Sequence, residues 1–142
     1  MLRYFVRLLA YAWPLPYTLF GITMGLLVGA RFQRVDGVIE IYGPSVAYLL
    51  GRMPLPAMAM TMGHVVFGCD RFALDVTREH ERVHVRQYER WGIGFVPAYL
   101  AISAVLFLRG RDGYRENPFE IEAYAIDRPD FSTGRLSDST DP

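Results

Sequence analysis

The chain has 142 residues and equal numbers of basic and acidic side chains, 15 of each, so its formal net charge is zero. This balance excludes the strongly basic surface that nucleic-acid-binding proteins present, and the length suits one domain with a modest core. The single cysteine, Cys69, excludes an internal disulfide, and we expect it to be a small buried apolar residue.

The first predicted element is an apolar N-terminal helix within residues 1–31. Residues 8–30 contain no charged side chain, and arginines flank them on both sides. Such a run is long enough to cross a bilayer, although Pro14 and Pro16 interrupt its first half. All the basic residues are arginine, a bias typical of GC-rich bacterial genomes. We therefore predict an anchor in the bacterial cell membrane, on a side that the flanking arginines leave open; a buried core helix is the alternative.

Glycines recur at every fourth position of this run, at Gly21, Gly25 and Gly29. Small residues at this spacing let two helices approach closely in lipid. The pattern therefore fits a homodimer formed through these glycines, or their packing against the second apolar stretch of the same chain.

The hydrophobic pattern then changes to that of strands. Residues 32–35 and 38–42 flank an Asp-Gly dipeptide, which favours the tight turn of a β-hairpin. Residues 45–50 are expected to form a short helical turn. The apolar run 59–68, rich in valine and methionine, is predicted to be a third strand. Together these segments predict a small antiparallel sheet.

The most informative stretch is a predicted helix over residues 75–91, which contains His80, Glu81 and His84 in an H-E-x-x-H box. Residues four apart on a helix lie one turn above each other, so both histidines can reach one metal ion, which Glu81 flanks. From that position a carboxylate can take a proton from water whose pKa the metal has lowered. The box therefore predicts a zinc (Zn²⁺) site with Glu81 as general base.

The same helix is amphipathic, and both histidines belong to its inward face. We expect Asp75 or Thr77 to cap its N-terminus, and Arg78, Arg82 and Arg86 to lie on its outer face. The inward stripe consists of His80, Val83, His84, Gln87, Tyr88 and Trp91.

A second uncharged stretch, residues 91–108, follows the box. It is at the lower limit for a membrane span, and a buried or interface-lying helix fits equally well. The polar loop 109–116 contains Tyr114, whose hydroxyl can donate a hydrogen bond to a tetrahedral oxyanion, so Tyr114 is a catalytic candidate beside Glu81. Polar and small residues then dominate, which predicts a disordered tail over residues 128–142.

A further helix is predicted to start at Asn117-Pro118, with Asn117 as N-cap and acidic residues in the first turns. Together with the H-E-R-V-H box, this segment resembles the gluzincin metallopeptidases, especially their very small members, over about residues 61–127. In that family a short second helix with the pattern E-x-x-A supplies the third zinc ligand. The resemblance implies Glu120, followed by Ala123, as this ligand, with Glu122 as the alternative.

The resemblance also implies a substrate strand and one departure from the family. In zinc peptidases of this type, an edge strand before the box pairs with an extended peptide, which assigns Met60 to Val66 to the cleft. His64 lies in this segment, where a packed histidine is the more usual role. Many relatives place an acid four residues after the third ligand to orient a histidine, and here that position is Tyr124.

These observations predict an α+β fold, in which residues 32–127 form a minimal zincin-like core of a small antiparallel sheet, the H-E-x-x-H helix and a second ligand helix. The predicted function is a membrane-associated zinc metallopeptidase that hydrolyses peptide bonds in a peptide or protein substrate. Two alternatives stay open. One is a non-catalytic membrane protein whose structural zinc has Glu122, Cys69 or His64 as fourth ligand, and the other is a packing pair of histidines without metal.

Overall fold

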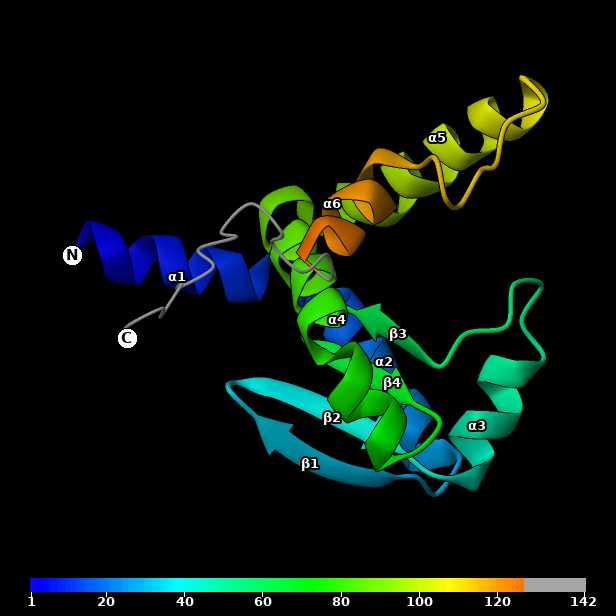
Figure 1. The fold of residues 1–142 in the computed structure, drawn as a ribbon. Helices are drawn as coiled ribbons and strands as arrows, with labels where there is room; N and C mark the ends of the chain where they lie inside the picture. The colour runs from blue at the N-terminus through cyan, green and yellow to red at the C-terminus, as the bar shows by residue number, and fades with distance from the viewer. Residues whose placement is uncertain (127–142) are drawn as a thin grey trace, which may run out of the picture.

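A four-stranded sheet lies between helices, and further helices extend away from it (Figure 1). The computed structural model describes residues 1–126. In chain order the elements are α1 (Leu2–Ala12), α2 (Leu15–Leu27), β1 (Arg31–Val35), β2 (Val38–Tyr42), α3 (Pro44–Gly51), β3 (Ala59–Met62), β4 (Val65–Gly68), α4 (Arg71–Trp91), the short 3₁₀ helix η1 (Gly92–Gly94), α5 (Phe95–Leu108) and α6 (Pro118–Ile126). The predicted α+β class is confirmed, whereas the predicted tail lies outside the described residues.

The predicted hairpin is confirmed. Strands β1 and β2 pair antiparallel, with Val35 opposite Val38. Asp36 and Gly37 between them have φ angles of 49° and 83°, the positive values that a two-residue turn matching the strand twist requires. Glycine and aspartate adopt this region more readily than other residues. Helix α3 likewise occupies the predicted helical turn.

The apolar run 59–68 forms two strands where one was predicted. The chain reverses at Gly63, which has a φ of 63°, and β3 and β4 pair antiparallel. Strand β4 then lies parallel to β2, so the order across the sheet is β1-β2-β4-β3. The prediction of a wholly antiparallel sheet is therefore wrong. An apolar run has no periodicity that marks a turn inside it.

The two faces of the sheet pack against different helices. Alternate residues of a strand point to opposite faces, and each face has its own apolar cluster. One cluster contains Val38, Tyr42, Ala59 and Val66 of the sheet with Leu74 and Val85 of α4. The other contains Ile41, Val65 and Phe67 with Val46 and Leu50 of α3, and Ile22 and Met24 of α2 pack against it. The sheet is thus a platform that holds α4 on one side and α2 on the other.

Residues 1–31 form two helices where one was predicted. Helix α1 ends at Ala12 and α2 begins at Leu15, with Pro14 between them. Proline has no amide hydrogen to donate to the preceding turn, and Pro14 itself lies outside the helical region, at φ −88° and ψ 6°. The apolar run of residues 8–30 is therefore divided between two helices that run in different directions (Figure 1).

Two glycines of the predicted ladder pack within the chain. A Cβ atom on Gly21 would lie 3.2 Å from the side chain of Val65, and one on Gly25 would lie 2.8 Å from Ile41. Glycine at these positions lets α2 approach the sheet closely. Gly29 has open space around it, and a homodimer through the three glycines stays a prediction.

One helical run among residues 1–126 is long and apolar enough to cross a membrane, judged by length and composition. It is Arg71–Leu108, which joins α4, η1 and α5, and 17% of its most apolar window is buried. Helix α2 is apolar but has 13 residues. The strongest candidate segment is therefore the second apolar stretch of the sequence, not the first.

Helix α4 begins at Arg71, four residues before its predicted start. Its N-cap is Asp70, whose Oδ1 accepts a hydrogen bond from the amide of Ala73 at 2.7 Å. The predicted caps were wrong: Thr77 lies inside the helix and donates to the carbonyl of Ala73 at 2.7 Å. Of the predicted inward stripe, Trp91 is the exception, because it is 49% exposed.

Buried charge fixes α4 on the sheet. Glu40 of β2 is 2% exposed, and its two carboxylate oxygens accept hydrogen bonds from Nε and Nη2 of Arg78 at 3.0 and 3.1 Å. Arg82 donates to the carbonyl of Val35 at 2.6 Å. Two of the arginines expected on a solvated outer face therefore bind the first hairpin and set the position of the box above it.

Replacing Glu40 with leucine should lower the free energy of unfolding by about 3 kcal/mol, because it removes one partner of a buried ion pair. The side chain of Arg78 is 25% exposed, so water relieves part of the penalty. Denaturant titration followed by circular dichroism measures the change. The control is Glu79→Gln at an exposed position of α4, for which less than about 0.5 kcal/mol is expected. Equal effects of the two substitutions would contradict the role of Glu40.

Candidate metal centre

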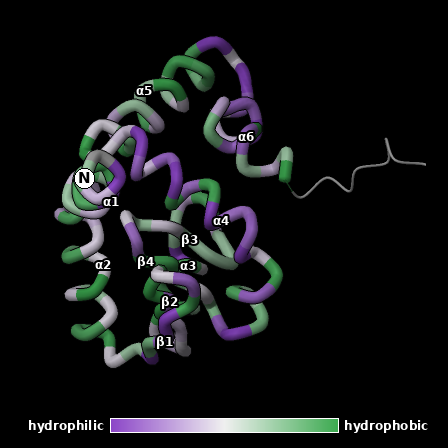
Figure 2. Tube along the Cα trace, turned by 90° about the vertical axis from the view of Figure 1, so that its left-hand side faces the viewer, coloured by the Kyte–Doolittle hydropathy of each residue, from purple (hydrophilic) through white to green (hydrophobic). Residues whose placement is uncertain are grey.

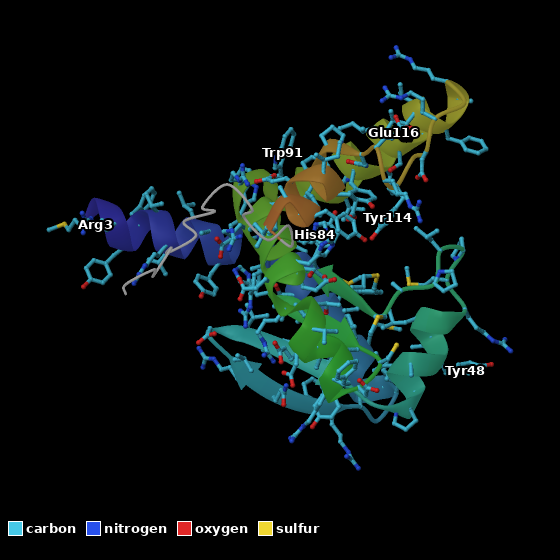
Figure 3. The ribbon with its side chains drawn as sticks, in the orientation of Figure 1. Arg3, Tyr48, His84, Trp91, Tyr114 and Glu116 are labelled. Atoms are coloured by element: carbon cyan, nitrogen blue, oxygen red, sulfur yellow. The ribbon has the colours of Figure 1, made fainter. Side chains whose placement is uncertain are left out.

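The two histidines of the box and Glu120 converge between α4 and α6. The Nε2 atoms of His80 and His84 lie 3.2 Å apart. Oε2 of Glu120 is 3.4 Å from Nε2 of His80, and Oε1 is 3.5 Å from Nε2 of His84. All three side chains are buried, and Figure 3 shows His84 on the side of α4 that α6 covers. The packing of α6 on α4 thus brings the three predicted ligands together.

These separations fit a tetrahedral ion. With bonds of about 2.0–2.1 Å, two ligand atoms of tetrahedral zinc lie roughly 3.3 Å apart. The two histidine nitrogens lie 3.2 Å apart, and each faces a different oxygen of Glu120, at 3.4 and 3.5 Å. Oε2 of Glu120 is also buried and accepts no hydrogen bond from the described residues. Within residues 1–126, His80, His84 and Glu120 form the group that could hold a metal ion. Three donors leave a fourth tetrahedral position for water.

Gln87 orients His84. Its Nε2 donates to the carbonyl of Phe119 and to Oε2 of Glu122, both at 2.9 Å, which turns its Oε1 toward Nδ1 of His84 at 2.9 Å. An amide oxygen only accepts, so Nδ1 carries the proton and Nε2 keeps its lone pair for the centre. Many relatives orient a histidine with an acid at the position of Tyr124, and in this chain Gln87 of α4 takes that role. Its position three residues after His84 on the inward stripe was the available signal in the sequence.

Glu120 is held by the start of α6 and by α5. The buried Asn117 accepts the amide hydrogen of Phe119 at 3.1 Å, as the predicted N-cap should, and donates to the carbonyl of Tyr99 at 3.1 Å and to Oγ of Ser103 at 2.9 Å. The hydroxyl of Tyr99 donates to Oε1 of Glu120 at 2.8 Å. Burial, with the nearby Glu120, raises the pKa of Tyr99 far above its usual range, so it stays a donor. Helix α5 therefore positions the third ligand.

The charges of the cluster suit a cation. Burial raises the pKa of Glu120, but His80 and His84 outweigh burial and hold this pKa at about 2. Glu120 is therefore a carboxylate at neutral pH. Burial lowers the pKa of His84, but Glu120, Glu81 and Gln87 together raise it by more, so the net direction is upward. A carboxylate that faces two imidazoles is a donor set suited to a divalent cation.

Glu81 lies beside the cluster and outside its donor set. It is 5% exposed, and its Oε2 accepts a hydrogen bond from Oγ1 of Thr61 on β3 at 2.6 Å. Burial raises the pKa of Glu81 by more than His84 and Thr61 lower it. A carboxylate with a raised pKa is a better proton acceptor near neutral pH. The contact with Thr61 was not foreseen from the sequence.

The predicted oxyanion donor Tyr114 approaches the cluster through a second tyrosine. Its hydroxyl lies 3.0 Å from the hydroxyl of Tyr124, whose ring packs on the ring of His80 with centroids 4.4 Å apart. Figure 3 shows Tyr114 on the loop that follows α5. A catalytic role for Tyr114 stays a prediction, whereas Tyr124 covers one side of His80.

The side chains considered as a fourth ligand lie elsewhere. Glu122 accepts a hydrogen bond from Arg90 on the exposed side of α6. Cys69 is half-buried, less than predicted. His64 is buried, and its Nε2 lies 3.0 Å from Oε1 of Glu89. None of the three belongs to the metal-binding group found among the described residues.

The predicted substrate strand is only partly at the edge of the sheet. Strand β3 is an edge strand, whereas Val65 and Val66 belong to β4, which lies between β2 and β3. Both valines are buried in the sheet. Of the predicted substrate strand, only the part within β3 lies at a free edge of the sheet. In β3, Thr61 contacts Glu81.

Replacing Gln87 with leucine should weaken metal binding about 10-fold to 100-fold, the usual effect of removing the partner of a ligating histidine. Competition with a chelator of known affinity measures the change. The variant Gln87→Glu keeps an acceptor for Nδ1 of His84 and should retain most of the affinity. Arg86→Gln at an exposed neighbouring position is the control. Unchanged affinity in the leucine variant would show that Gln87 has no role in orienting His84.

Comparison of the chain with protein-family models, with curated proteins and with solved structures finds no match.

Proposed function

We propose that the protein is a membrane-associated zinc metallopeptidase of the gluzincin type, which hydrolyses peptide bonds in a peptide or protein substrate. The observation that carries this proposal is the convergence of His80, His84 and Glu120, whose ligand atoms all lie within 4.8 Å of one another. Three protein donors are typical of catalytic zinc sites, which keep one position for water or substrate. The H-E-x-x-H spacing also supports a catalytic zinc site.

The residues would divide the chemistry as follows. His80, His84 and Glu120 hold the ion, which when bound polarises the scissile carbonyl and lowers the pKa of water. Glu81 takes the proton of the attacking water and returns it to the leaving amine, while Thr61 keeps the carboxylate of Glu81 in place. Burial raises the pKa of Tyr114, so its hydroxyl keeps its proton and can donate to the developing oxyanion.

The alternative is a non-catalytic metal-binding membrane protein with a structural zinc site. The deep burial of the cluster favours it, because His80 and His84 are 7% and 8% exposed and Glu120 is 3% exposed. A substrate needs access to the ion, whereas a structural ion needs none. Turnover therefore separates the two functions.

The test uses the full-length protein purified in detergent and loaded with zinc. The proposal expects cleavage of an unfolded protein substrate, loss of cleavage on chelation, and its return when zinc is restored. One tightly bound zinc per chain without cleavage would support the structural site. Folded protein that takes up no zinc would contradict both functions.

A further inference from the structure

Three helices expose apolar side chains along one side of the molecule. Figure 2 shows α1, α2 and α5 toward this side, with α4 and α6 toward the opposite side. The exposed side chains include Leu8 of α1, Leu19 and Phe20 of α2, and Leu100 and Leu108 of α5, which are between 55% and 82% exposed. We call this surface the apolar face. Soluble monomers rarely expose so much apolar area together, so the face calls for a partner.

The helices of the apolar face meet at one corner. Trp13, between α1 and α2, packs so closely on Gly92 of η1 that a Cβ there would lie 1.2 Å from the indole ring. The hydroxyl of Tyr17 donates to the carbonyl of Ile93 at 3.0 Å. Trp13 and Ile93 are themselves 54% and 59% exposed. The apolar face is thus continuous from the N-terminal helices to the start of α5.

Polar side chains of α2 and α5 form hydrogen bonds within the protein. The exposed Thr23 of α2 donates to the carbonyl of Leu19 at 2.8 Å, within its own helix, as hydroxyls do in lipid. The polar side chains of α5, Tyr99 and Ser103, form a stripe that binds α6 and the loop before it. The side chains of α5 that are exposed to the surroundings are therefore almost all apolar.

The N-terminal helices of the apolar face, α1 and α2, carry only positive charges. Residues 1–35 contain four arginines and no acidic side chain. Arg3 and Arg7 lie one turn apart on α1 and are exposed, while Phe5 and Leu9 lie on other positions of the same helix. A short amphipathic helix of this composition is typical of segments that lie in the surface of an anionic bilayer. Two copies of this positively charged surface would repel each other. The charge pattern therefore favours an anionic lipid surface as the partner over a second copy of the chain.

The geometry of α2 and α5 argues against a span. They have 13 and 14 residues, or about 20 Å each, against about 30 Å of hydrocarbon. The rest of the long run, α4, is fixed to the sheet through Arg78 and Glu40. From the end of α5 the chain returns through a loop with an Arg111–Glu116 ion pair to α6, which packs on α4. Both ends of α5 are thus tied to the same polar body.

We propose that the protein binds an anionic lipid bilayer in its plane through the apolar face, with α1 at the headgroups and α2 and α5 embedded in one leaflet. This inference deepens the membrane association of the proposed function and rests on it, but it does not depend on the metal. Because Tyr99 of α5 binds Glu120, the metal centre lies one helix away from the lipid. Its substrate class is then a peptide segment at the membrane surface.

Vesicle flotation tests the lipid partner. Full-length protein is diluted from detergent onto preformed vesicles of phosphatidylcholine alone or mixed with phosphatidylglycerol. Binding to the mixed vesicles is expected, and Arg3→Gln with Arg7→Gln should weaken it about 30-fold, since each basic residue near such a surface contributes roughly fivefold. Phe20→Glu places a charge on the face and should abolish flotation. Phe72→Glu, at a 67% exposed phenylalanine of α4 outside the face, should float like the wild type.

Three results would overturn the proposal. The first is wild-type protein that does not float, and the second is a Phe20→Glu variant that floats normally. The third is a wild-type dimer in detergent that does not bind vesicles and that Phe20→Glu dissociates, which would assign the face to a second copy of the chain. Zinc content of each variant is measured in parallel and should stay at the wild-type value. Loss of zinc with normal flotation would count against the metal centre alone, so the two proposals fail separately.

Labelling distinguishes an in-plane helix from a span. A cysteine is placed at Arg111, just after α5, in a Cys69→Ser background, and a membrane-impermeant maleimide is added outside the vesicles. An in-plane α5 leaves Arg111→Cys on the outside, so full labelling is expected. If the maleimide labels Arg111→Cys only after detergent opens the vesicles, α5 crosses the bilayer, and the in-plane arrangement would be overturned.

Discussion

Replacing Glu81 with glutamine should reduce peptide hydrolysis about 10²-fold to 10⁴-fold, the usual contribution of a positioned general base, and leave zinc binding unchanged. Glutamine has the size of glutamate and its amide oxygen can still accept the hydrogen bond that Thr61 gives to Glu81. It cannot take a proton from water at neutral pH. Zinc content and kcat on a fluorogenic peptide, both measured in detergent, test the prediction.

The matched control for this variant is Glu79→Gln, two residues earlier on the exposed side of the same helix. It makes the same chemical change without touching the cluster, so wild-type kcat is expected. A Glu81→Gln variant that cleaves at the full rate would remove Glu81 from the mechanism. A variant that loses zinc together with activity would instead show that Glu81 supports the metal.

Replacing His84 with alanine should remove the bound metal altogether. This change deletes one of three donors and leaves Gln87 and Glu120 without the imidazole between them. Elemental analysis is expected to find one zinc per chain in the wild type and none in His84→Ala. Zinc should also stabilise the wild type against unfolding, by about 2.7 kcal/mol at a free concentration one hundred times the dissociation constant, and should have no such effect on the variant.

His64→Ala is the control for a buried histidine outside the cluster. His64 is 4% exposed and its ring stacks on Tyr11, with centroids 4.3 Å apart, so this variant should be less stable and yet bind zinc fully. Zinc retained by His84→Ala would contradict the donor set proposed here. Folded wild-type protein without metal would mean that His80 and His84 are packing residues.

The comparison of prediction with structure is most instructive for α4. Its box and most of its inward face follow from the spacing of residues within one helix, which local geometry dictates. The attachment of Arg78 to Glu40, by contrast, depends on β2, 38 residues earlier in the chain. No property of the α4 segment alone indicates that partner.

The same division holds across the molecule. The sequence by itself determined the first hairpin, the helix that begins at Pro118, and the placement of His80 and His84 on one helix face, because turn chemistry, capping and helical spacing act over a few residues. Glu120 was implied by the family resemblance and not by local spacing. Tertiary structure decided that β4 inserts beside β2, and that Tyr99 and Thr61 contact the cluster. These features arise from packing between segments far apart in the chain, and such contacts leave no regular pattern in the order of residues.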